Sequence, residues 1–191
     1  MNSSINILSL LRKREIELVV NEIFYSIQGE SSRVGLPTVF IRLTGCPLRC
    51  QYCDTEYAFF KGKKMKMSEI LNKIKNYSTR YITVTGGEPL AQKSCLILLK
   101  KLCDIGYDVS LETSGAIDVS KVDKRIKKII DIKTPASKEE NKNKYENLNY
   151  LTSEDEIKFV ICNRSDYVWA KEKIIEKKIS KTCEIIFSPG T

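Results

Sequence analysis

The stretch TGCPLRCQYCDT, residues 44–55, holds three of the chain's seven cysteines. Cys46, Cys50 and Cys53 follow the spacing C-x3-C-x2-C, and clustered thiolates are ligands for Zn²⁺ or for iron–sulfur clusters. A structural zinc site uses four protein ligands, but the chain has no histidine and its other cysteines are scattered. A cluster held by three thiolates leaves one iron open to a small molecule. The spacing therefore favours a cluster with an exchangeable position.

The remaining cysteines are not expected to bind metal. An odd total of seven argues against a disulfide framework, and the N-terminal stretch MNSSINILSLLRKRE does not read as a secretory signal. No apolar run approaches the roughly 18 residues of a membrane helix, so we expect a cytoplasmic protein with reduced thiols. The cysteines outside the short stretch are predicted to be small core residues, namely Cys95, Cys103, Cys162 and Cys183.

The composition predicts a globular protein with a solvated, lysine-rich exterior. Among its 191 residues are 32 Lys and Arg against 24 Asp and Glu, which gives a net charge of +8. The lysines are spread along the chain and no nucleic-acid recognition signature accompanies them, so we expect no direct contact with nucleic acid. The length suits one domain, which we place at residues 17–191 after a polar lead-in at residues 1–16.

The chain alternates predicted strands with predicted helices, which indicates an α/β fold with a mainly parallel sheet. The helices are expected at residues 66–77, with Ser68 as N-cap, and at 94–106 and 165–178. A weakly hydrophobic loop or linker is expected at residues 136–149. With fewer than eight β/α units, the sheet should form a partial, open barrel whose ligands lie beyond the carboxyl ends of its strands. The strands are expected at residues 17–28, 38–45, 81–89, 107–115, 127–135, 156–162 and 183–190.

A second motif, TGGEP at residues 85–89, ends one of these strands. Its glycines would let the backbone approach a ligand closely. Together with the cysteine spacing, this motif resembles the radical S-adenosylmethionine (SAM) superfamily. The resemblance implies a [4Fe-4S] cluster whose open iron chelates SAM, and SAM cleavage to methionine and a 5′-deoxyadenosyl radical. The cofactor would carry the difficult chemistry while the protein orients and shields it.

Four further stretches narrow the resemblance. They are FYSIQGE (24–30), TVFIRLTGCPLRCQYCDT (38–55), DIKTPAS (131–137) and IFSP (186–189). Together they resemble the 7-carboxy-7-deazaguanine synthase family over residues 17–189. The resemblance implies a lyase of queuosine biosynthesis, on the route to a tRNA modification. Such an enzyme contracts 6-carboxy-5,6,7,8-tetrahydropterin to 7-carboxy-7-deazaguanine and releases ammonia, with Mg²⁺ required and SAM regenerated. A homodimer and a reductant protein such as flavodoxin are also implied.

The resemblance assigns a role to each matching residue, with no catalytic side chain because the radical forms on SAM. The cluster ligands would be Cys46, Cys50 and Cys53, and the Mg²⁺ ligand would be Thr55, whose hydroxyl oxygen suits that ion. The SAM contacts would be Tyr52, Cys53, Asp54, Gly87, Asp131, Ile132 and Lys133. The substrate contacts would be Ile27, Gln28, Gly29, Thr85 and Arg42, whose guanidinium fits a carboxylate.

Some points stay open on the sequence. Glu88 and Glu112 could each contact ligand or form a structural ion pair, and Trp169 is expected in the core. Family members continue past the last strand with a histidine-containing segment, whereas this sequence ends at FSPGT, so the barrel is expected to be C-terminally shortened, with an effect on substrate affinity and dimer stability. The alternatives are another small radical SAM enzyme of the glycyl-radical activase type, or a non-enzymatic thiolate metal-binding module.

Overall fold

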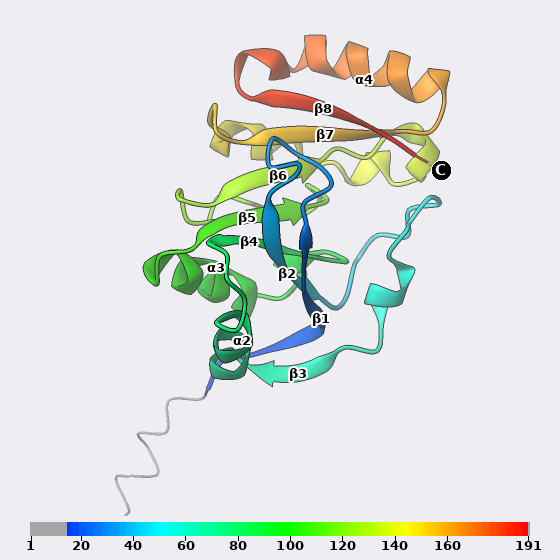
Figure 1. The fold of residues 1–191 in the computed structure, drawn as a ribbon. Helices are drawn as coiled ribbons and strands as arrows, with labels where there is room; N and C mark the ends of the chain where they lie inside the picture. The colour runs from blue at the N-terminus through cyan, green and yellow to red at the C-terminus, as the bar shows by residue number, and fades with distance from the viewer. Residues whose placement is uncertain (1–14, 191) are drawn as a thin grey trace, which may run out of the picture.

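The structure is a computed structural model that describes residues 15–190, so any prediction for residues 1–14 lies outside it. Eight strands form one sheet in the order β3-β1-β2-β4-β5-β6-β7-β8 (Figure 1). From β2 onward every neighbouring pair is parallel. The strands are β1 (Glu17–Ile27), β2 (Pro37–Leu43), β3 (Lys63–Lys66), β4 (Tyr81–Gly86), β5 (Asp108–Thr113), β6 (Lys127–Asp131), β7 (Glu156–Ile161) and β8 (Glu184–Pro189).

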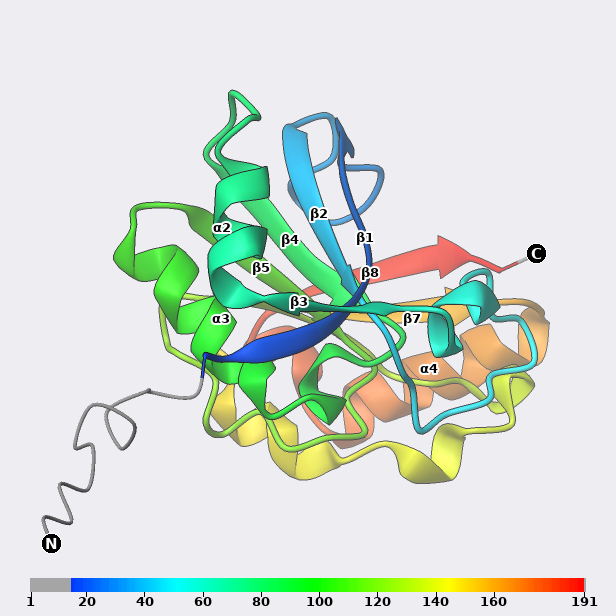
Figure 2. The same cartoon turned by 90° about the horizontal axis from the view of Figure 1, so that it is seen from below.

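The sheet curves, and its helices lie on the outer face, so that the strands form an open barrel (Figure 2). The predicted α/β fold with a mainly parallel sheet is thereby confirmed. Asn163 caps the last helix, because its side chain accepts a hydrogen bond from the Asp166 amide at 2.9 Å. The α-helices are α2 (Met67–Ile74), α3 (Ser94–Asp104) and α4 (Arg164–Glu176).

One local prediction is wrong, and one strand was not predicted. Helix α2 begins at Met67 with Lys66 as N-cap, and Ser68 lies within the helix, where its hydroxyl donates to Glu15 at 2.5 Å. The sequence analysis also missed β3, which pairs antiparallel with β1 at one edge of the sheet. Met65 is its single apolar residue between lysines, so it lacks the apolar alternation of a strand. Lysines are common on edge strands because they oppose pairing with another chain.

The core lies between the sheet and its helices. Leu98, Leu99 and Leu102 of α3 are fully buried, and Trp169 of α4 packs against the same core from a partly buried position, as predicted. Burial of each large aliphatic side chain contributes about 1.5–3 kcal/mol to folding. Cys95 and Cys183 are buried among these residues.

The loop between β1 and β2 reaches across to the far strands of the sheet (Figure 1). Glu30 in this loop accepts hydrogen bonds from Lys158 of β7 at 2.8 Å and from Ser188 of β8 at 2.9 Å. The Ser32 amide donates to Glu156 of β7 at 3.1 Å. These contacts join the first strand pair to the last two strands, and they bound the barrel interior on that side.

Residues 136–149 form a loop, as predicted, but it is a fixed loop and not a linker. It contains the short 3₁₀ helices η4 (Glu140–Lys142) and η5 (Tyr145–Tyr150), and η3 (Pro135–Ser137) leads into it. Asn147 is almost fully buried and donates to the carbonyls of Gly115 and Ile117, both at 2.9 Å. Polar contacts of this kind order a segment whose low hydrophobicity suggests mobility.

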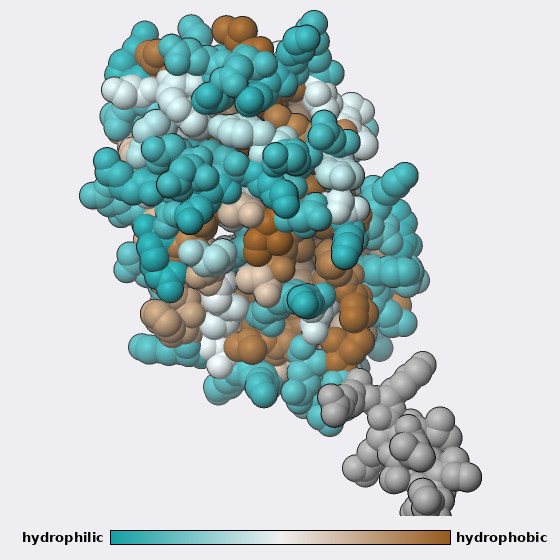
Figure 3. All heavy atoms as spheres, turned by 180° about the vertical axis from the view of Figure 1, so that it is seen from behind, coloured by the Kyte–Doolittle hydropathy of each residue, from teal (hydrophilic) through white to brown (hydrophobic). Residues whose placement is uncertain are grey.

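The surface carries both polar and apolar side chains. On the face turned away in Figure 1, polar residues cover the upper part and apolar residues gather lower down (Figure 3). Large apolar side chains with high exposure include Ile27, Val34, Phe60 and Ile175. Within residues 15–190, no helix is long and apolar enough to cross a membrane.

Candidate active site

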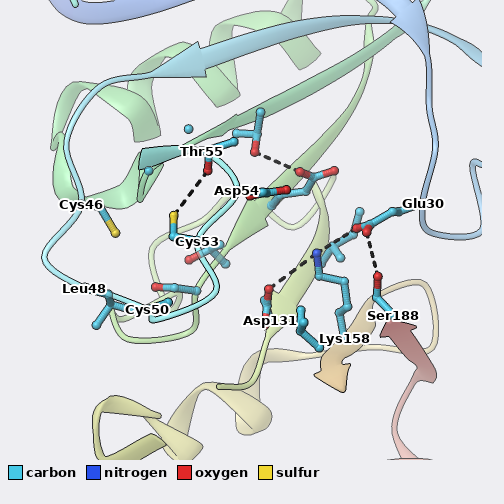
Figure 4. A pocket seen from close by; sticks show the side chains of 18 of the residues that line it. Glu30, Cys46, Leu48, Cys50, Cys53, Asp54, Thr55, Asp131, Lys158 and Ser188 are labelled. Carbon is cyan, nitrogen blue, oxygen red and sulfur yellow. Dashed lines mark hydrogen bonds and ion pairs between the residues drawn. The ribbon is translucent and has the colours of Figure 1, made fainter. Parts of the chain in front are cut away.

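A cavity of about 430 Å³ opens at the carboxyl ends of the parallel strands. The cysteine loop forms one wall and the loop between β1 and β2 lies opposite it (Figure 4). Each parallel strand contributes a polar or glycine residue to the lining, near the carboxyl end of the strand in every case except Lys158, which lies earlier in β7. Those residues are Arg42 of β2, Thr85 and Gly86 of β4, Glu112 and Thr113 of β5, Asp131 of β6, Lys158 of β7 and Ser188 of β8.

The three clustered cysteines line this cavity together. Cys46, Cys50 and Cys53 are free and half-buried, on a loop without helix or strand. Burial raises the pKa of Cys46, and it raises that of Cys50 to about 11. The Cys53 sulfur lies 3.8 Å from the Thr55 hydroxyl. Burial thus favours the protonated thiol at Cys46 and Cys50, and metal binding there would release these protons.

The glycine pair that ends β4 lies directly against the cysteine loop. A Cβ atom on Gly86 would lie 2.3 Å from the Leu43 carbonyl oxygen, and one on Gly87 would lie 2.7 Å from the Cys46 Cβ. The Glu88 amide then donates to the Gly45 carbonyl at 2.8 Å. Close approach of two backbones is thus one reason for glycine at these positions, in addition to any contact with a ligand.

Glu88 is a structural residue. Its side chain is fully buried and accepts hydrogen bonds from the Leu90 amide, the Thr113 hydroxyl, and the Ser114 amide and hydroxyl at 2.5–2.9 Å. These bonds tie the turn after β4 to the end of β5. This resolves the choice left open for Glu88, since its carboxylate has protein partners on both oxygens.

Three thiols suit an iron–sulfur cluster better than a single ion. Among residues 15–190, no three His, Cys, Asp or Glu side chains converge on a point where one metal ion could bind. Thiolates that each hold a different iron of a cluster stand farther apart than thiolates around one ion. Because all three sulfurs belong to one loop facing an open cavity, a [4Fe-4S] cluster fits this donor set.

Two polar atoms buried beside the cysteine loop have no hydrogen-bond partner among the described residues. In the described part of the chain, the Asp131 Oδ1 atom and the Tyr52 hydroxyl are buried without a hydrogen bond. The second oxygen of Asp131 pairs with Lys133 at 3.1 Å and with Lys158 at 3.5 Å. Burial alone would raise the Asp131 pKa, but the two lysines outweigh it and hold that pKa below its usual range. A charged oxygen next to the thiols is therefore free to bind a polar ligand.

At the other end of the cavity, a hydrogen-bonded group surrounds Glu112. Its carboxylate accepts from the Gln28 amide at 3.2 Å and from the Thr85 hydroxyl at 2.9 Å. Gln28 and Thr85 are both buried, and they come from the β1–β2 loop and from β4. This arrangement offers donors and acceptors side by side, as the edge of a nitrogen heterocycle requires.

Arg42 and Thr55 lie along the same cavity. The Arg42 Nε atom donates to Glu22 at 2.8 Å, and its guanidinium lies over the rings of Phe24 and Tyr57. Within residues 15–190 neither Nη atom of Arg42 donates a hydrogen bond to protein. The pair with Glu22 therefore leaves the outer edge of the guanidinium available for an anion.

Comparison with known proteins agrees with this geometry. The sequence model of the radical SAM superfamily matches residues 40–176, which include all three clustered cysteines. The 7-carboxy-7-deazaguanine synthase of Koribacter versatilis is 43% identical over 90% of this chain and 77% of its own length. That of Chlorobaculum tepidum is 44% identical over 92% of this chain and 81% of its own length. The chain belongs to this synthase family of radical SAM proteins. Membership implies a [4Fe-4S] cluster and SAM as cofactors.

Solved structures show the same fold. QueE from Escherichia coli superposes with a TM-score of 0.78 at 24% identity, over 91% of this chain and 84% of its own. SuiB from Streptococcus suis, bound to its precursor peptide SuiA, gives a TM-score of 0.58 at 17% identity, over 78% of this chain and 38% of its own. The predicted open barrel of the radical SAM type is therefore confirmed.

Most of the site residues predicted from the family resemblance line the cavity, and three do not. Asp54, Tyr52, Gly87 and Lys133 line it with the residues described above. The Ile27 side chain is 66% exposed, and Ile132 is buried in the core with its amide bonded to the Lys158 carbonyl at 2.9 Å. Gly29 has no atom within 4 Å of where a Cβ would lie, and it is not part of the lining. The ligand contacts predicted for these three residues therefore have no support in the lining of the cavity.

The sequence analysis missed the residues that close the cavity opposite the cysteine loop. Glu30, Lys158 and Ser188 all line the cavity, and Glu30 accepts a hydrogen bond from each of the other two (Figure 4). Lys158 is the third residue of β7 and lies level with Asp131, the last residue of β6, so a lysine within a mostly apolar strand was the available signal. Its pairing with Glu30, 128 positions earlier, has no local sequence signal.

Proposed function

We propose that this protein is a 7-carboxy-7-deazaguanine synthase that contracts the ring of 6-carboxy-5,6,7,8-tetrahydropterin and releases ammonia. One observation carries the proposal beyond family membership. A single cavity joins three free thiols at one end to a bonded group of amide, hydroxyl and carboxylate at the other. The first end suits a cluster with SAM, and the second end suits a pterin edge.

At the first end, Cys46, Cys50 and Cys53 would hold the cluster. Together the cluster and SAM would supply a carbon-centred radical that takes a hydrogen atom from C6 of the pterin. The chain's task is to orient these groups and to exclude water from them. The unpartnered Asp131 oxygen and the Tyr52 hydroxyl support a contact with polar groups of SAM, since both are buried beside the thiols.

Lys133 and Gly87 would complete the SAM contacts. Burial disfavours the Lys133 ammonium, but the Asp131 carboxylate outweighs it and raises the pKa of Lys133. The lysine therefore stays charged and can face an anionic group. Gly87 lines the cavity next to Cys46 and carries no side chain, so its backbone would be the group that contacts SAM.

At the second end, Gln28, Thr85 and Glu112 would bind the pterin ring. Glu112, left open by the sequence alone, is given this role because its carboxylate already accepts from the other two. Arg42 would pair with the substrate carboxylate through its free Nη atoms, since its Nε atom is taken by Glu22.

Thr55 would hold Mg²⁺ between the two ends. Its hydroxyl oxygen is a hard ligand, and Mg²⁺ commonly binds one or two protein oxygens while keeping part of its water shell. The exposed Asp54 next to it lines the cavity and would help attract the ion.

The test is anaerobic reconstitution of the cluster, followed by incubation with the carboxytetrahydropterin, SAM, Mg²⁺ and a chemical reductant. We expect about four irons per chain, formation of 7-carboxy-7-deazaguanine, and no net loss of SAM. SAM cleavage without the deazaguanine product would contradict the proposal and favour a radical SAM enzyme of the activase type. Bound zinc without iron or SAM would favour a metal-binding module.

The remaining partner predictions belong to the same proposal. We expect a flavodoxin-type protein as the electron donor, a homodimer, and a cytoplasmic location. Sedimentation of the reconstituted protein at several concentrations would test the dimer. Replacement of the chemical reductant by reduced flavodoxin would test the donor.

A further inference from the structure

We propose that Arg49 is a positioning residue that holds the cysteine loop in its ligand-binding shape before any cluster is present. Arg49 lies within the motif, just before Cys50. Its Nη1 atom donates to the Cys46 carbonyl at 2.8 Å and to the Leu48 carbonyl at 2.6 Å. The Arg49 side chain thus fixes the conformation of the segment between the first two cysteines by bonding to two of its carbonyl groups.

The same guanidinium is fixed from outside the loop. It lies 4.4 Å from the ring centre of Phe59 and 6.0 Å from that of Phe60, and both rings stand after the third cysteine. A planar guanidinium stacks on aromatic rings while its edge donates hydrogen bonds, which the lysine ammonium cannot do. Arg49 therefore joins the start of the loop to the segment that follows it.

A second segment holds the loop from the other side. The Arg49 amide donates to the Glu139 carboxylate at 2.6 Å, and the Gln51 amide donates to the Ser137 carbonyl at 3.1 Å. Both partners belong to the stretch that follows β6, the strand that carries Asp131. Arg49 thus contributes its side chain and its main chain to one arrangement that includes the cluster loop and a neighbouring strand.

The loop needs such contacts because it has few others. It contains no helix or strand, and its internal backbone hydrogen bonds include the one from the Cys53 amide to the Cys50 carbonyl at 3.2 Å. Ordering a free loop costs conformational entropy for each residue fixed. If Arg49 orders the loop before the cluster binds, the entropy of the loop is lost during folding, and cluster binding is not weakened by that loss.

Arg49 acts through the loop and not on the ligands. It is exposed and is not among the residues that line the cavity, so it would not touch the pterin or SAM. The proposal rests on cluster binding by the three cysteines, and it does not depend on which substrate the cavity takes.

The test compares Arg49→Gln with the matched control Arg164→Gln. Arg164 is also exposed and also lies over an aromatic ring, that of Tyr167 at 5.1 Å, but it belongs to α4. In metal-free protein we expect amide hydrogen exchange at residues 46–53 to be about tenfold faster in Arg49→Gln. The rate at which Arg49→Gln takes up iron, monitored by absorbance and by iron counting, should be several-fold lower than that of the unmodified protein. The control should match the unmodified protein in both measurements.

Two further variants separate positioning from a general loss of fold. Arg49→Lys keeps the positive charge but lacks the planar guanidinium that stacks on Phe59. Its rate of iron loading should therefore lie between those of Arg49→Gln and the unmodified protein. Phe59→Leu removes the stacking and keeps the hydrogen bonds, so it should speed exchange by less than Arg49→Gln. Unfolding midpoints in urea should stay close to that of the unmodified protein for all variants. Unchanged exchange in Arg49→Gln, or faster exchange with unchanged loading, would overturn the proposal even if the protein proves to be an active synthase.

Discussion

The two ends of the cavity are built in opposite ways. At the thiol end, the ligand groups come mainly from one loop of about ten residues and have few protein partners. Within residues 15–190, the Cys53 sulfur has only a long contact to the Thr55 hydroxyl at 3.8 Å, and Asp131 Oδ1 and the Tyr52 hydroxyl lack hydrogen bonds. Buried polar groups without partners are rare in proteins, so this end is arranged for a bound group.

At the opposite end of the cavity, here called the strand end, the polar groups surround Glu112 and Glu30. These groups come from distant parts of the chain and are joined by hydrogen bonds. Gln28 and Thr85 donate to Glu112, while Lys158 and Ser188 donate to Glu30. A ligand that binds here must exchange these bonds for its own. Substitutions at the thiol end should therefore abolish binding of its ligand. Substitutions at the strand end should only weaken ligand binding, because part of the preorganised hydrogen bonding is lost.

The largest effect is expected at the thiol end. Cys50→Ser replaces a thiolate with a hydroxyl that stays protonated at neutral pH. We expect the iron content to fall and synthase turnover to drop by more than about 10³-fold, because the radical chemistry depends on the cluster. Iron and sulfide counting and product detection after anaerobic reconstitution would measure both.

Cys103→Ala is the matched control for that variant. Cys103 is also a free, half-buried cysteine, but it packs against the core from α3. It should keep full iron content and turnover, with a small loss of stability. Turnover that survives in Cys50→Ser would remove the contrast between the two ends.

The second effect tests the strand end. Glu112→Gln places an amide where two donors now meet a carboxylate. One donor then loses its acceptor, so kcat/KM for the pterin should fall by about ten- to a hundredfold, or ~1–3 kcal/mol. Iron content and SAM binding should not change.

An exposed carboxylate provides the control for Glu112. Glu69 on α2 is exposed and accepts from its own N-cap, the Lys66 amide, at 3.2 Å. Glu69→Gln should leave steady-state kinetics unaltered. If Glu112→Gln abolished cluster loading instead, the two ends would not be separable in the way described.

The same contrast explains what the sequence could predict. The thiol end is contiguous in the chain, so the spacing of Cys46, Cys50 and Cys53 was sufficient to predict a cluster site. The alternation of strands and helices also predicted the parallel sheet, whereas the roles of Arg42 and Thr85 came from the family resemblance. Both are properties of short stretches, and short stretches are what a single sequence displays.

The strand end depends on pairings that no short stretch contains. Glu30 and Lys158 are 128 positions apart, and only the path of the β1–β2 loop brings them together. Glu88 and Glu112 look alike in sequence, as acidic residues near strand ends. The structure separates them, because backbone and hydroxyl donors surround Glu88 while Glu112 faces the cavity. The fold determines that difference, so it could not be predicted.

The third prediction uses this difference between Glu88 and Glu112. Glu88→Gln should lower the free energy of unfolding by about 2–3 kcal/mol, because a buried carboxylate then loses charged hydrogen bonds that tie β4 to β5. Glu112→Gln should cost less than about 1 kcal/mol, since solvent in the cavity can replace its partners. Urea unfolding of the two metal-free variants would compare them. A larger loss from Glu112→Gln would reverse the assigned roles.

The smallest effect concerns the contact that closes the strand end. Burial opposes the charge on Glu30, but Lys158 and the hydrogen bonds from Lys158 and Ser188 outweigh it, so the pKa of Glu30 lies below its usual value. A lowered folded-state pKa adds stability above the unfolded pKa, and that stability is lost as the pH falls through the folded pKa.

The Glu30 side chain is 43% exposed, so solvent screening limits the gain to less than about 1 kcal/mol. Glu30→Gln should therefore be slightly less stable near pH 7 and equal to the unmodified protein once the pH lies below the folded-state pKa of Glu30. Glu146→Gln, an exposed residue of η5, serves as the control in the same urea series. A difference that grows toward acid pH would show that Glu30 does not gain from its contact with Lys158, and that the β1–β2 loop is held at β7 by other contacts such as that of Ser32 with Glu156.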